Sequence, residues 1–241
     1  MKSKYIHTKD LHNNESPKQI VPTLTDLFQP KSVVDIGCGT GTFLKEFKNC
    51  GVPKVFGYDG DWVNRDLLKE NLEQSEFLSC NLEHTISFKE KYDLVMCLEV
   101  AEHLSEEAAN ILVDNLITAG TVLVFSAAIP KQGGQNHLNE QWLGYWTHKF
   151  EKKGYVVDDI LKPLFWNNEK IDYWYKQNMV IVRPLDFKYS EILKTNVLKD
   201  VIHKDLFLER TQRYDTLRNG EQRPKLYLKL LLKSLINSFR S

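Results

Sequence analysis

Short apolar runs alternate with segments of helical spacing from about residue 31 to residue 183. Seven runs have the length and composition of β-strands: SVVDIG (32–37), KVFGYDG (54–60), EFLSCNL (76–82), YDLVMCLEV (92–100), TVLVFSAAI (121–129), YVVDDIL (155–161) and NMVIVRP (178–184). Amphipathic segments such as FLKEF (43–47) and EQWLGYWTHKFEKK (140–153) lie between them. This alternation predicts an α/β protein in which helices cover both faces of a seven-stranded, mostly parallel sheet.

Two flanking segments fall outside the alternation. Residues 1–29 are predicted to be an N-terminal helical segment, residues 30–184 the α/β domain, and residues 185–241 a helical C-terminal extension. The last part of this extension, residues 223–241, has five Lys and Arg residues, no acidic residue and an apolar majority. Such a helix can lie on an anionic membrane surface, dock on the α/β domain or pair with a second copy in a homodimer.

Charge and composition narrow the choice of partner and compartment. Lys plus Arg and Asp plus Glu each number 32, so the formal net charge is zero. Affinity for nucleic-acid phosphates needs an excess of cations, and the balance therefore speaks against nucleic acid as a partner. The N-terminus MKSKYIHTKD lacks the apolar core of a signal peptide, and the four cysteines show no CxxC spacing. We expect a cytoplasmic protein.

A glycine-rich loop connects the first strand to a helix, in the order Asp35-Ile36-Gly37-Cys38-Gly39-Thr40-Gly41. Glycines let the backbone approach a ligand closely, and this edge of an α/β sheet is where nucleotides bind. The dinucleotide fingerprint needs a glycine where this chain has Thr42, and a P-loop lysine is absent. The carboxylate of Asp35 would repel a pyrophosphate but would attract an amino group and a sulfonium. The loop therefore favours a cationic nucleoside.

The loop resembles the first motif of class I S-adenosylmethionine-dependent methyltransferases, which has the form acid-x-Gly-x-Gly-x-Gly. The resemblance covers about residues 30–183 and continues with Asp59 at the end of the second strand and with the segment Glu99-Val-Ala-Glu-His103-Leu. It implies a Rossmann-like sheet whose last strand is antiparallel, with S-adenosylmethionine as cofactor and S-adenosylhomocysteine as product. The cofactor-binding residues that it implies are Asp35, Gly37, Cys38, Gly39, Gly41, Asp59, Gly60, Trp62, Asn81, Leu82, Leu98 and Glu99.

Three of these residues have specific roles in the resemblance. Asp59 would accept hydrogen bonds from the ribose hydroxyls. Trp62, three residues after Asp59, either flanks the adenine or packs the second helix on the sheet. Asn81, which with Leu82 is expected to end the third strand, stands where the family commonly has an aspartate facing the adenine.

Two histidines are candidates for the base that removes the proton of a hydroxyl acceptor. His103 follows the fourth strand, and His137 lies in the loop after the fifth, which Gly133 and Gly134 make adaptable. Residues 137–146 resemble a feature of methyltransferases from bacterial surface-glycan and related small-molecule pathways. That resemblance implies O-methylation of a small polar acceptor, such as a sugar or a surface-glycan precursor.

Two alternatives remain open. Although the favoured prediction has no metal, Glu99, Glu102, His103 and His137 together offer two carboxylates and two imidazoles to a divalent ion. A similar Glu-x-x-Glu-His pattern with a downstream histidine is found in metal-assisted RNA 3′-terminal 2′-O-methyltransferases. The chain could also be a non-catalytic scaffold that binds S-adenosylmethionine while a partner does the chemistry.

Overall fold

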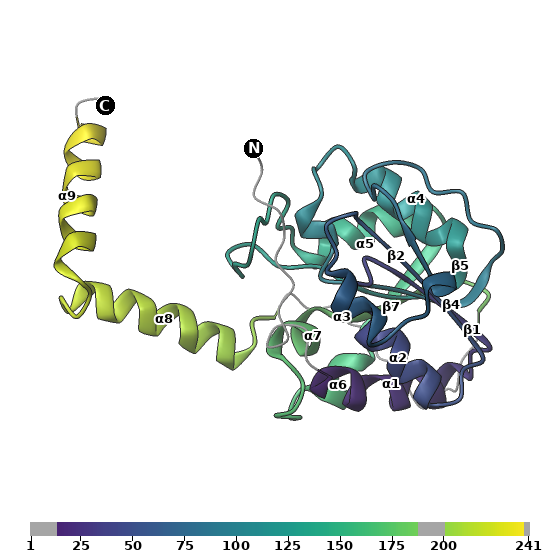
Figure 1. The fold of residues 1–241 in the computed structure, drawn as a ribbon. Helices are drawn as coiled ribbons and strands as arrows, with labels where there is room; N and C mark the ends of the chain where they lie inside the picture. The colour runs from purple at the N-terminus through teal and green to yellow at the C-terminus, as the bar shows by residue number, and fades with distance from the viewer. Residues whose placement is uncertain (1–13, 188–200, 239–241) are drawn as a thin grey trace. The chain divides into compact units, whose positions relative to one another are not determined.

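The computed structural model describes residues 14–187 and 201–238, and its main element is a seven-stranded sheet (Figure 1). The strands are β1 (Ser32–Ile36), β2 (Lys54–Asp59), β3 (Phe77–Ser79), β4 (Tyr92–Leu98), β5 (Gly120–Ser126), β6 (Tyr155–Asp158) and β7 (Val180–Pro184). Their order is β3-β2-β1-β4-β5-β7-β6, and only β7 runs antiparallel to its neighbours. The predicted fold, including the antiparallel last strand, is confirmed.

Helices cover both faces of the sheet, and each face has its own apolar core (Figure 1). One core joins α4 (Ala109–Ala119) and α5 (Leu143–Glu151) to the sheet. The other joins α1 (Glu15–Phe28), α2 (Thr42–Asn49), α3 (Arg65–Lys69) and α6 (Leu161–Phe165) to the opposite face. The largest buried side chains include Trp146 and Phe150 on one side and Phe47 and Ile20 on the other. Burial on both faces explains why the central strands read as continuous apolar runs.

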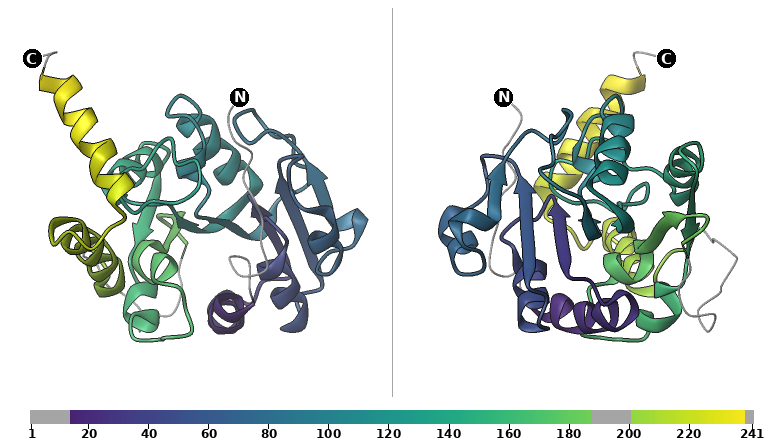
Figure 2. Two further views of the ribbon diagram at one scale, coloured as in Figure 1. Left: turned by 60° about the vertical axis from the view of Figure 1, so that its left-hand side comes forward. Right: turned by 90° about the vertical axis from the view of Figure 1, so that its right-hand side faces the viewer.

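Strand β1 lies at the point where the strand order reverses, with β2 on one side and β4 on the other. Figure 2 shows β1 and β2 side by side and pointing the same way, with α1 at one end of them. The carboxyl ends of β1, β2, β4 and β5 therefore meet at one edge, where open α/β sheets bind their ligands.

The third strand is shorter than predicted. It ends at Ser79, so Asn81 and Leu82 follow the strand instead of ending it. The N–H of Cys80 still donates to the carbonyl of Asp59 at 2.8 Å, and the side-chain oxygen of Asn81 accepts from the N–H of Glu83 at 3.0 Å. This local hydrogen bond turns the chain away from the sheet, as asparagine side chains often do.

The helix predicted from residue 140 begins only at Leu143. The N–H groups of Leu138 and Asn139 both donate to the carbonyl of Glu102, at 2.7 and 3.0 Å. These bonds hold the segment before the helix as a loop against the end of β4, so a contact distant in sequence overrides the local helical pattern.

The described residues from 202 to 238 form a compact unit of their own. The described part of this helical unit contains α8 (Lys204–Arg218) and α9 (Pro224–Ser238). Residues 188–200 and 239–241 of the predicted extension lie outside the described residues. Within residues 14–187 and 201–238, every helix is too short or too polar to cross a bilayer.

Candidate functional site

The loop after β1 follows a path that requires glycine. The φ angles of Gly37, Gly39 and Gly41 are 88°, 53° and 79°. Backbone in this region is strained for residues with a side chain. The N–H of Gly37 donates to the carbonyl of Tyr58 at 2.7 Å, and a Cβ on Gly37 would lie 2.3 Å from Cγ2 of Val100. The turn is thus held tightly between the ends of β2 and β4.

Asp59 closes this loop with both oxygens of its carboxylate. Oδ2 accepts from the N–H of Gly39 at 2.7 Å, and Oδ1 accepts from the N–H of Gly60 at 2.6 Å. The residue is 7% exposed. Each carboxylate oxygen has further acceptor capacity, which the hydroxyls of a ligand can use.

A second buried carboxylate, Asp35, lies near Asp59 beneath the loop. Burial raises the pKa of Asp35 to about 7, and the charge of Asp59 adds to the rise. Burial also raises the pKa of Asp59, to about 6, although the amide hydrogen bonds from Gly39 and Gly60 lower it in part. Two carboxylates that resist ionisation in a small buried volume suit a ligand that brings positive charge.

The residues predicted around the adenine differ in how they can reach it. Trp62 lies over Gly60, where a Cβ would come within 2.3 Å of the indole ring, and the residue is 40% exposed. Asn81 is exposed beyond β3, and because its oxygen binds the N–H of Glu83, its NH₂ group is the part left to meet a ligand. Leu82 is buried in the core at 3% exposure. Only its backbone can face the cofactor.

The side chain of Cys38 also points into the protein. A Cβ on Gly57 would lie 2.6 Å from the Cys38 sulfur, which packs beneath the loop. The N–H of Cys38 donates to the carbonyl of Tyr58 at 3.1 Å. Cys38 therefore shapes the loop from below.

Leu98 ends β4, and Glu99 follows it with a φ angle of 53°, which is uncommon for a residue with a side chain. The Glu99 carboxylate accepts from Nε2 of Gln132 at 2.7 Å and from Nδ2 of Asn178 at 3.0 Å, and its N–H donates to Oγ of Ser126 at 3.0 Å. Burial raises the pKa of Glu99 to about 7, although these hydrogen bonds partly oppose the rise. Gln132 and Asn178 hold this carboxylate in place and Ser126 holds the backbone of Glu99; none of the three was predicted from the sequence.

Glu102, His103 and His137 form a cluster in which one ligand atom from each lies within 4.8 Å of the others. The rings of the two histidines meet edge to face, with centroids 4.9 Å apart. Glu102 is 1% exposed, and neither carboxylate oxygen has a partner within hydrogen-bonding geometry. Burial raises the pKa of Glu102, and the charge of Glu99 raises it further. The backbone amides of Glu102 and Ala128 lower it, but by less. Glu99 is bound elsewhere and does not join this cluster.

The loop that carries His137 is organised by Glu140, a residue that the sequence analysis missed. Its carboxylate accepts from Nδ1 of His137 at 2.8 Å and from the N–H groups of Lys131 and Gly133 at 2.6 and 2.9 Å. Burial alone would raise the pKa of Glu140, but these three hydrogen bonds outweigh it and lower the pKa. An ionised Glu140 favours the His137 tautomer with the proton on Nδ1, which leaves the lone pair on Nε2.

The imidazole of His137 packs closely against Gly134. A Cβ on Gly134 would lie 2.2 Å from Nε2 of His137, so a side chain at this position would displace the ring. The glycine predicted to make the loop adaptable is thus also needed for the position of His137.

The charges of four carboxylates act on one buried thiol, that of Cys97. The pKa of the buried Cys97 thiol is raised by burial and then by the charges of Asp35, Glu102, Asp59 and Glu99. The loop after β1 and the cluster after β4 therefore belong to one region.

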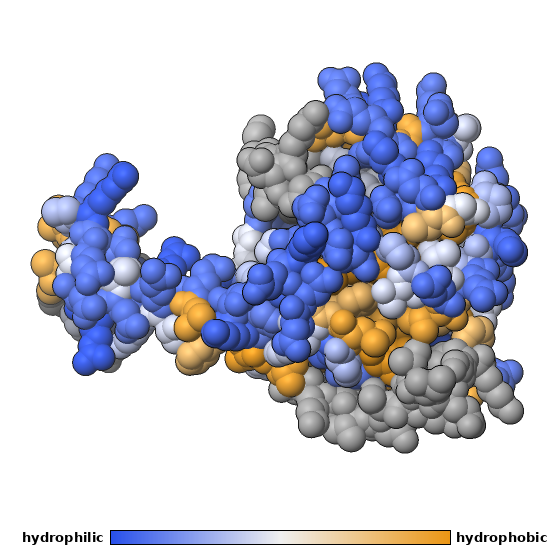
Figure 3. Space-filling model, turned by 90° about the horizontal axis from the view of Figure 1, so that it is seen from below, coloured by the Kyte–Doolittle hydropathy of each residue, from blue (hydrophilic) through white to orange (hydrophobic). Residues whose placement is uncertain are grey.

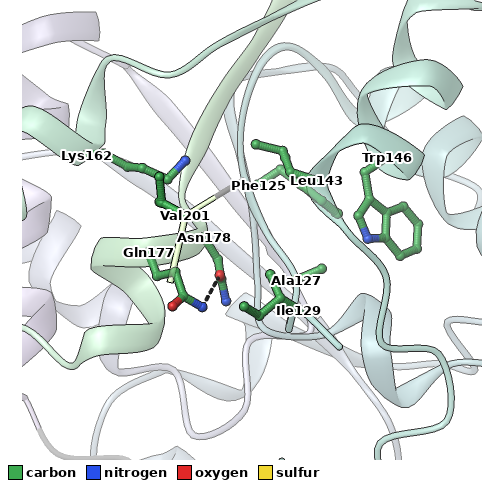
Figure 4. A pocket seen from close by; sticks show the side chains of 9 residues that line it. All are labelled: Phe125, Ala127, Ile129, Leu143, Trp146, Lys162, Gln177, Asn178 and Val201. Carbon is green, nitrogen blue, oxygen red and sulfur yellow. Dashed lines mark hydrogen bonds between the residues drawn. The ribbon is translucent and has the colours of Figure 1, made fainter. Parts of the chain in front are cut away.

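A small cavity lies behind the Glu99 network, and Figure 4 shows the side chains around it. Gln177 and Asn178 enter from α7 (Tyr173–Asn178), with a 3.0 Å hydrogen bond between them, and Ala127 and Ile129 follow β5. The cavity volume is about 10 Å³, enough for about one water molecule. It is too small for an acceptor.

Comparisons with known proteins agree with the fold and the loop. A protein-family model described as "Methyltransferase domain" matches residues 10–171. A ubiquinone biosynthesis O-methyltransferase from Rhodopseudomonas palustris is 28% identical over 180 residues, which cover 66% of this chain and 64% of the relative. A ribosomal protein L11 methyltransferase from Fusobacterium nucleatum is 32% identical over 123 residues, which cover 47% of this chain and 36% of the relative.

A solved structure shares the fold at low identity. CalS10 from Micromonospora echinaspora, an amino pentose methyltransferase solved with S-adenosylmethionine bound, has a TM-score of 0.54 at 14% identity over 76% of this chain and 98% of that one. The family match covers more than half of the chain and includes the loop after β1, Asp59 and the end of β4. The chain therefore belongs to the class I S-adenosylmethionine-dependent methyltransferases, a family whose methyl donor is S-adenosylmethionine.

Proposed function

We propose that this protein transfers the methyl group of S-adenosylmethionine to a hydroxyl oxygen of a small polar acceptor, with His137 as the base. The observation that carries the proposal is the hydrogen bond between His137 Nδ1 and Glu140. It orients the imidazole and leaves Nε2 as the proton acceptor, in a position that only a glycine at residue 134 allows. A histidine held by a carboxylate is a common form of general base.

The cofactor and the acceptor meet at one edge of the sheet in this proposal. The donor is held by the loop after β1 and by Asp59, and the histidines follow β4 and β5, which pair with each other in parallel beside β1. In the reaction, Nε2 takes the proton of the hydroxyl, the acceptor oxygen forms a bond to the methyl carbon, and the bond between that carbon and the sulfur breaks. The products are a methyl ether, S-adenosylhomocysteine and one proton on the histidine. Alignment of these atoms supplies most of the rate enhancement.

The choice of a sugar or surface-glycan precursor as acceptor is supported by the resemblance of residues 137–146 and by the fold shared with an amino pentose methyltransferase. The related proteins named above act on other acceptors, so the acceptor has to be found by experiment. The screen uses radiolabelled S-adenosylmethionine with nucleotide sugars, phosphorylated metabolites, phenols and short RNAs. We expect transfer to a member of the first two classes and loss of that transfer in His137→Gln.

A second candidate function is favoured by the unpartnered carboxylate of Glu102. Glu102, His103 and Nε2 of His137 supply one oxygen and two nitrogen ligands, a set that suits Mn²⁺, Zn²⁺ or Fe²⁺, and Glu140 supports His137 as an outer carboxylate would. A divalent ion held there would bind and polarise a hydroxyl, as in the RNA 3′-terminal 2′-O-methyltransferases that the sequence resembles.

Chelation separates the two candidates. After dialysis against EDTA, activity that persists supports His137 as a base, and activity that disappears and returns with Mn²⁺ or Mg²⁺ supports the metal. A protein that binds S-adenosylmethionine tightly but turns over no acceptor in the screen, with or without metal, would instead be the non-catalytic scaffold.

A further inference from the structure

We infer that α9 docks on the surface of an anionic lipid bilayer and lies in the plane of the interface. The helix begins at Pro224, the position at which proline fits a helix best, and continues to Ser238. Its described residues carry Lys225, Lys229 and Lys233 and no acidic residue. Helix α9 belongs to the second compact unit of the chain, whereas the residues of the proposed methyl-transfer site belong to the first.

The lysines lie along one line of the helix. They are spaced at i, i+4 and i+8, which places them on one stripe. All three are exposed, and among residues 14–187 and 201–238 none of them has an ion-pair partner. An uncompensated row of lysines attracts a negatively charged surface.

An apolar face adjoins the lysine stripe. Leu228, Leu231 and Leu235 are spaced at i, i+3 and i+7, and their exposed fractions are 58%, 57% and 48%. Leu232 and Ile236, which are 53% and 54% exposed, continue the apolar surface up to and into the lysine stripe. Leu226 and Leu230, which are 38% and 40% exposed, lie on the other side of the lysines, so apolar side chains flank the stripe on both sides. The atoms of the unit formed by residues 202–238 accordingly alternate between orange and blue at the surface in Figure 3. Apolar side chains next to lysines are typical of helices whose leucines enter the acyl boundary while the lysines reach the headgroups.

The neighbouring helix α8 does not cover this face. The contact between the two helices is made by Tyr227, whose hydroxyl donates to the carbonyl of Leu217 at 2.7 Å and accepts from the N–H of Gln222 at 3.2 Å. These bonds fix the turn between α8 and α9. Helix α8 itself has acidic as well as basic residues and no apolar face comparable to that of α9.

A bilayer fits this surface better than a protein partner does. If α9 packed its leucines against protein, its lysines would have to stay in solvent or pair with acidic residues. The α9 helix of a second copy has no acidic residue that could pair with them. Anionic headgroups neutralise the lysine stripe, and the acyl boundary takes the leucines. The 15 residues of α9 are too few to span the bilayer.

The test is co-sedimentation of the full chain with vesicles of phosphatidylcholine alone and of equal parts phosphatidylcholine and phosphatidylserine. We expect pelleting with the second kind only, weakened by added salt. The triple substitution Lys225→Gln, Lys229→Gln and Lys233→Gln should lower the partition coefficient by about 100-fold, since each lysine near such a surface contributes about fivefold. The matched control is Lys204→Gln, Arg213→Gln and Arg218→Gln, which removes the same charge from exposed positions of α8 and should leave most of the binding intact.

The apolar face is tested separately by Leu228→Gln, Leu231→Gln and Leu235→Gln, with light scattering of the free protein in parallel. Loss of pelleting with an unchanged mass supports the bilayer. Equal pelleting of the wild type with both kinds of vesicle, or none with either, overturns the inference. A dimer that this leucine variant converts to a monomer, without vesicle binding by the wild type, would assign the face to a second copy. Binding of S-adenosylmethionine should be the same in all variants.

Discussion

Replacing Asp35 with asparagine should make the ligand-free protein more stable and the cofactor complex weaker. The carboxylate is 5% exposed, and its pKa rises from 3.8 to about 7. Between pH 3.8 and about 7, Asp35 keeps its proton in the folded chain but has lost it in the unfolded chain. The free energy of unfolding therefore falls as the pH rises through this range. A rise of this size corresponds to about 4 kcal/mol above pH 7, which is an upper bound for the stabilisation by Asp35→Asn.

Asp35→Asn should have the opposite effect on the complex with S-adenosylmethionine, which it should weaken. The cationic ligand favours the ionised carboxylate, so the affinity of the wild type should fall by up to about tenfold for each pH unit below 7. A lost hydrogen bond or contact to a charged group costs about 1.5 to 3 kcal/mol, so Asp35→Asn should weaken binding about 10- to 100-fold at pH 8. The pH dependence below 7 should shrink in the variant, and what is left should reflect Asp59.

Thermal unfolding at pH 5 and pH 8 measures the first effect, and titration calorimetry in buffers of different ionisation enthalpy measures the second together with the proton released. Asp66→Asn is the control, because Asp66 has a side chain that is 94% exposed and should change neither quantity by much. The electrostatic reasoning is refuted if Asp35→Asn destabilises the ligand-free protein at pH 8, or if its stability gain is the same at pH 5.

Three further changes test other parts of the site. Gly37→Ala should lower the free energy of unfolding by about 2 kcal/mol or more and weaken cofactor binding, because its φ is positive and the Cβ would meet Val100; a melting temperature equal to the wild type's would contradict this. Glu140→Gln should lower kcat about 10- to 100-fold on the acceptor found in the screen while leaving the Kd for S-adenosylmethionine unchanged, whereas equal losses in both would make Glu140 structural. Mn²⁺ should raise the melting temperature of the wild type but not of Glu102→Gln if the second candidate function holds, and the same rise in both proteins would remove Glu102 from the ligand set.

The fold and the cofactor loop could be predicted because their signals are local. The central strands β1, β4 and β5 are apolar runs buried on both faces, and the loop needs glycine at positions whose φ angles are positive. Asp35 and Asp59 lie at the carboxyl ends of the neighbouring strands β1 and β2, so the pairing of these strands brings them together. These features depend on residues near each other in sequence or on the register of neighbouring strands.

The acceptor side could be predicted only in part, because loops bring its residues together. Glu99 and His137 were identified from the sequence, but Gln132 and Asn178 reach Glu99 from positions 33 and 79 residues away. Glu140 stands three residues after His137, a spacing that usually indicates two residues on one face of a helix. Because the helix was predicted to begin at residue 140, Glu140 was assigned to the helix and not to the loop that it organises. A polar residue near a candidate histidine in a glycine-containing loop is therefore worth testing as its orienting partner.

The acidic edge also has a consequence for the proton that the proposed reaction releases. The donor enters with a positive sulfonium and leaves as S-adenosylhomocysteine with a neutral sulfur, so in the proposed site methyl transfer would remove one positive charge from the neighbourhood of Asp35. Without that charge the pKa of Asp35 returns toward about 7, where the carboxylate can take up a proton at the same moment that His137 holds one from the acceptor. Proton uptake by Asp35 weakens its attraction for the amino group of the product. The acid that binds the donor in its cationic form would thus favour release of the product, and in Asp35→Asn the affinities for donor and product should move closer together, which calorimetry with both ligands can measure.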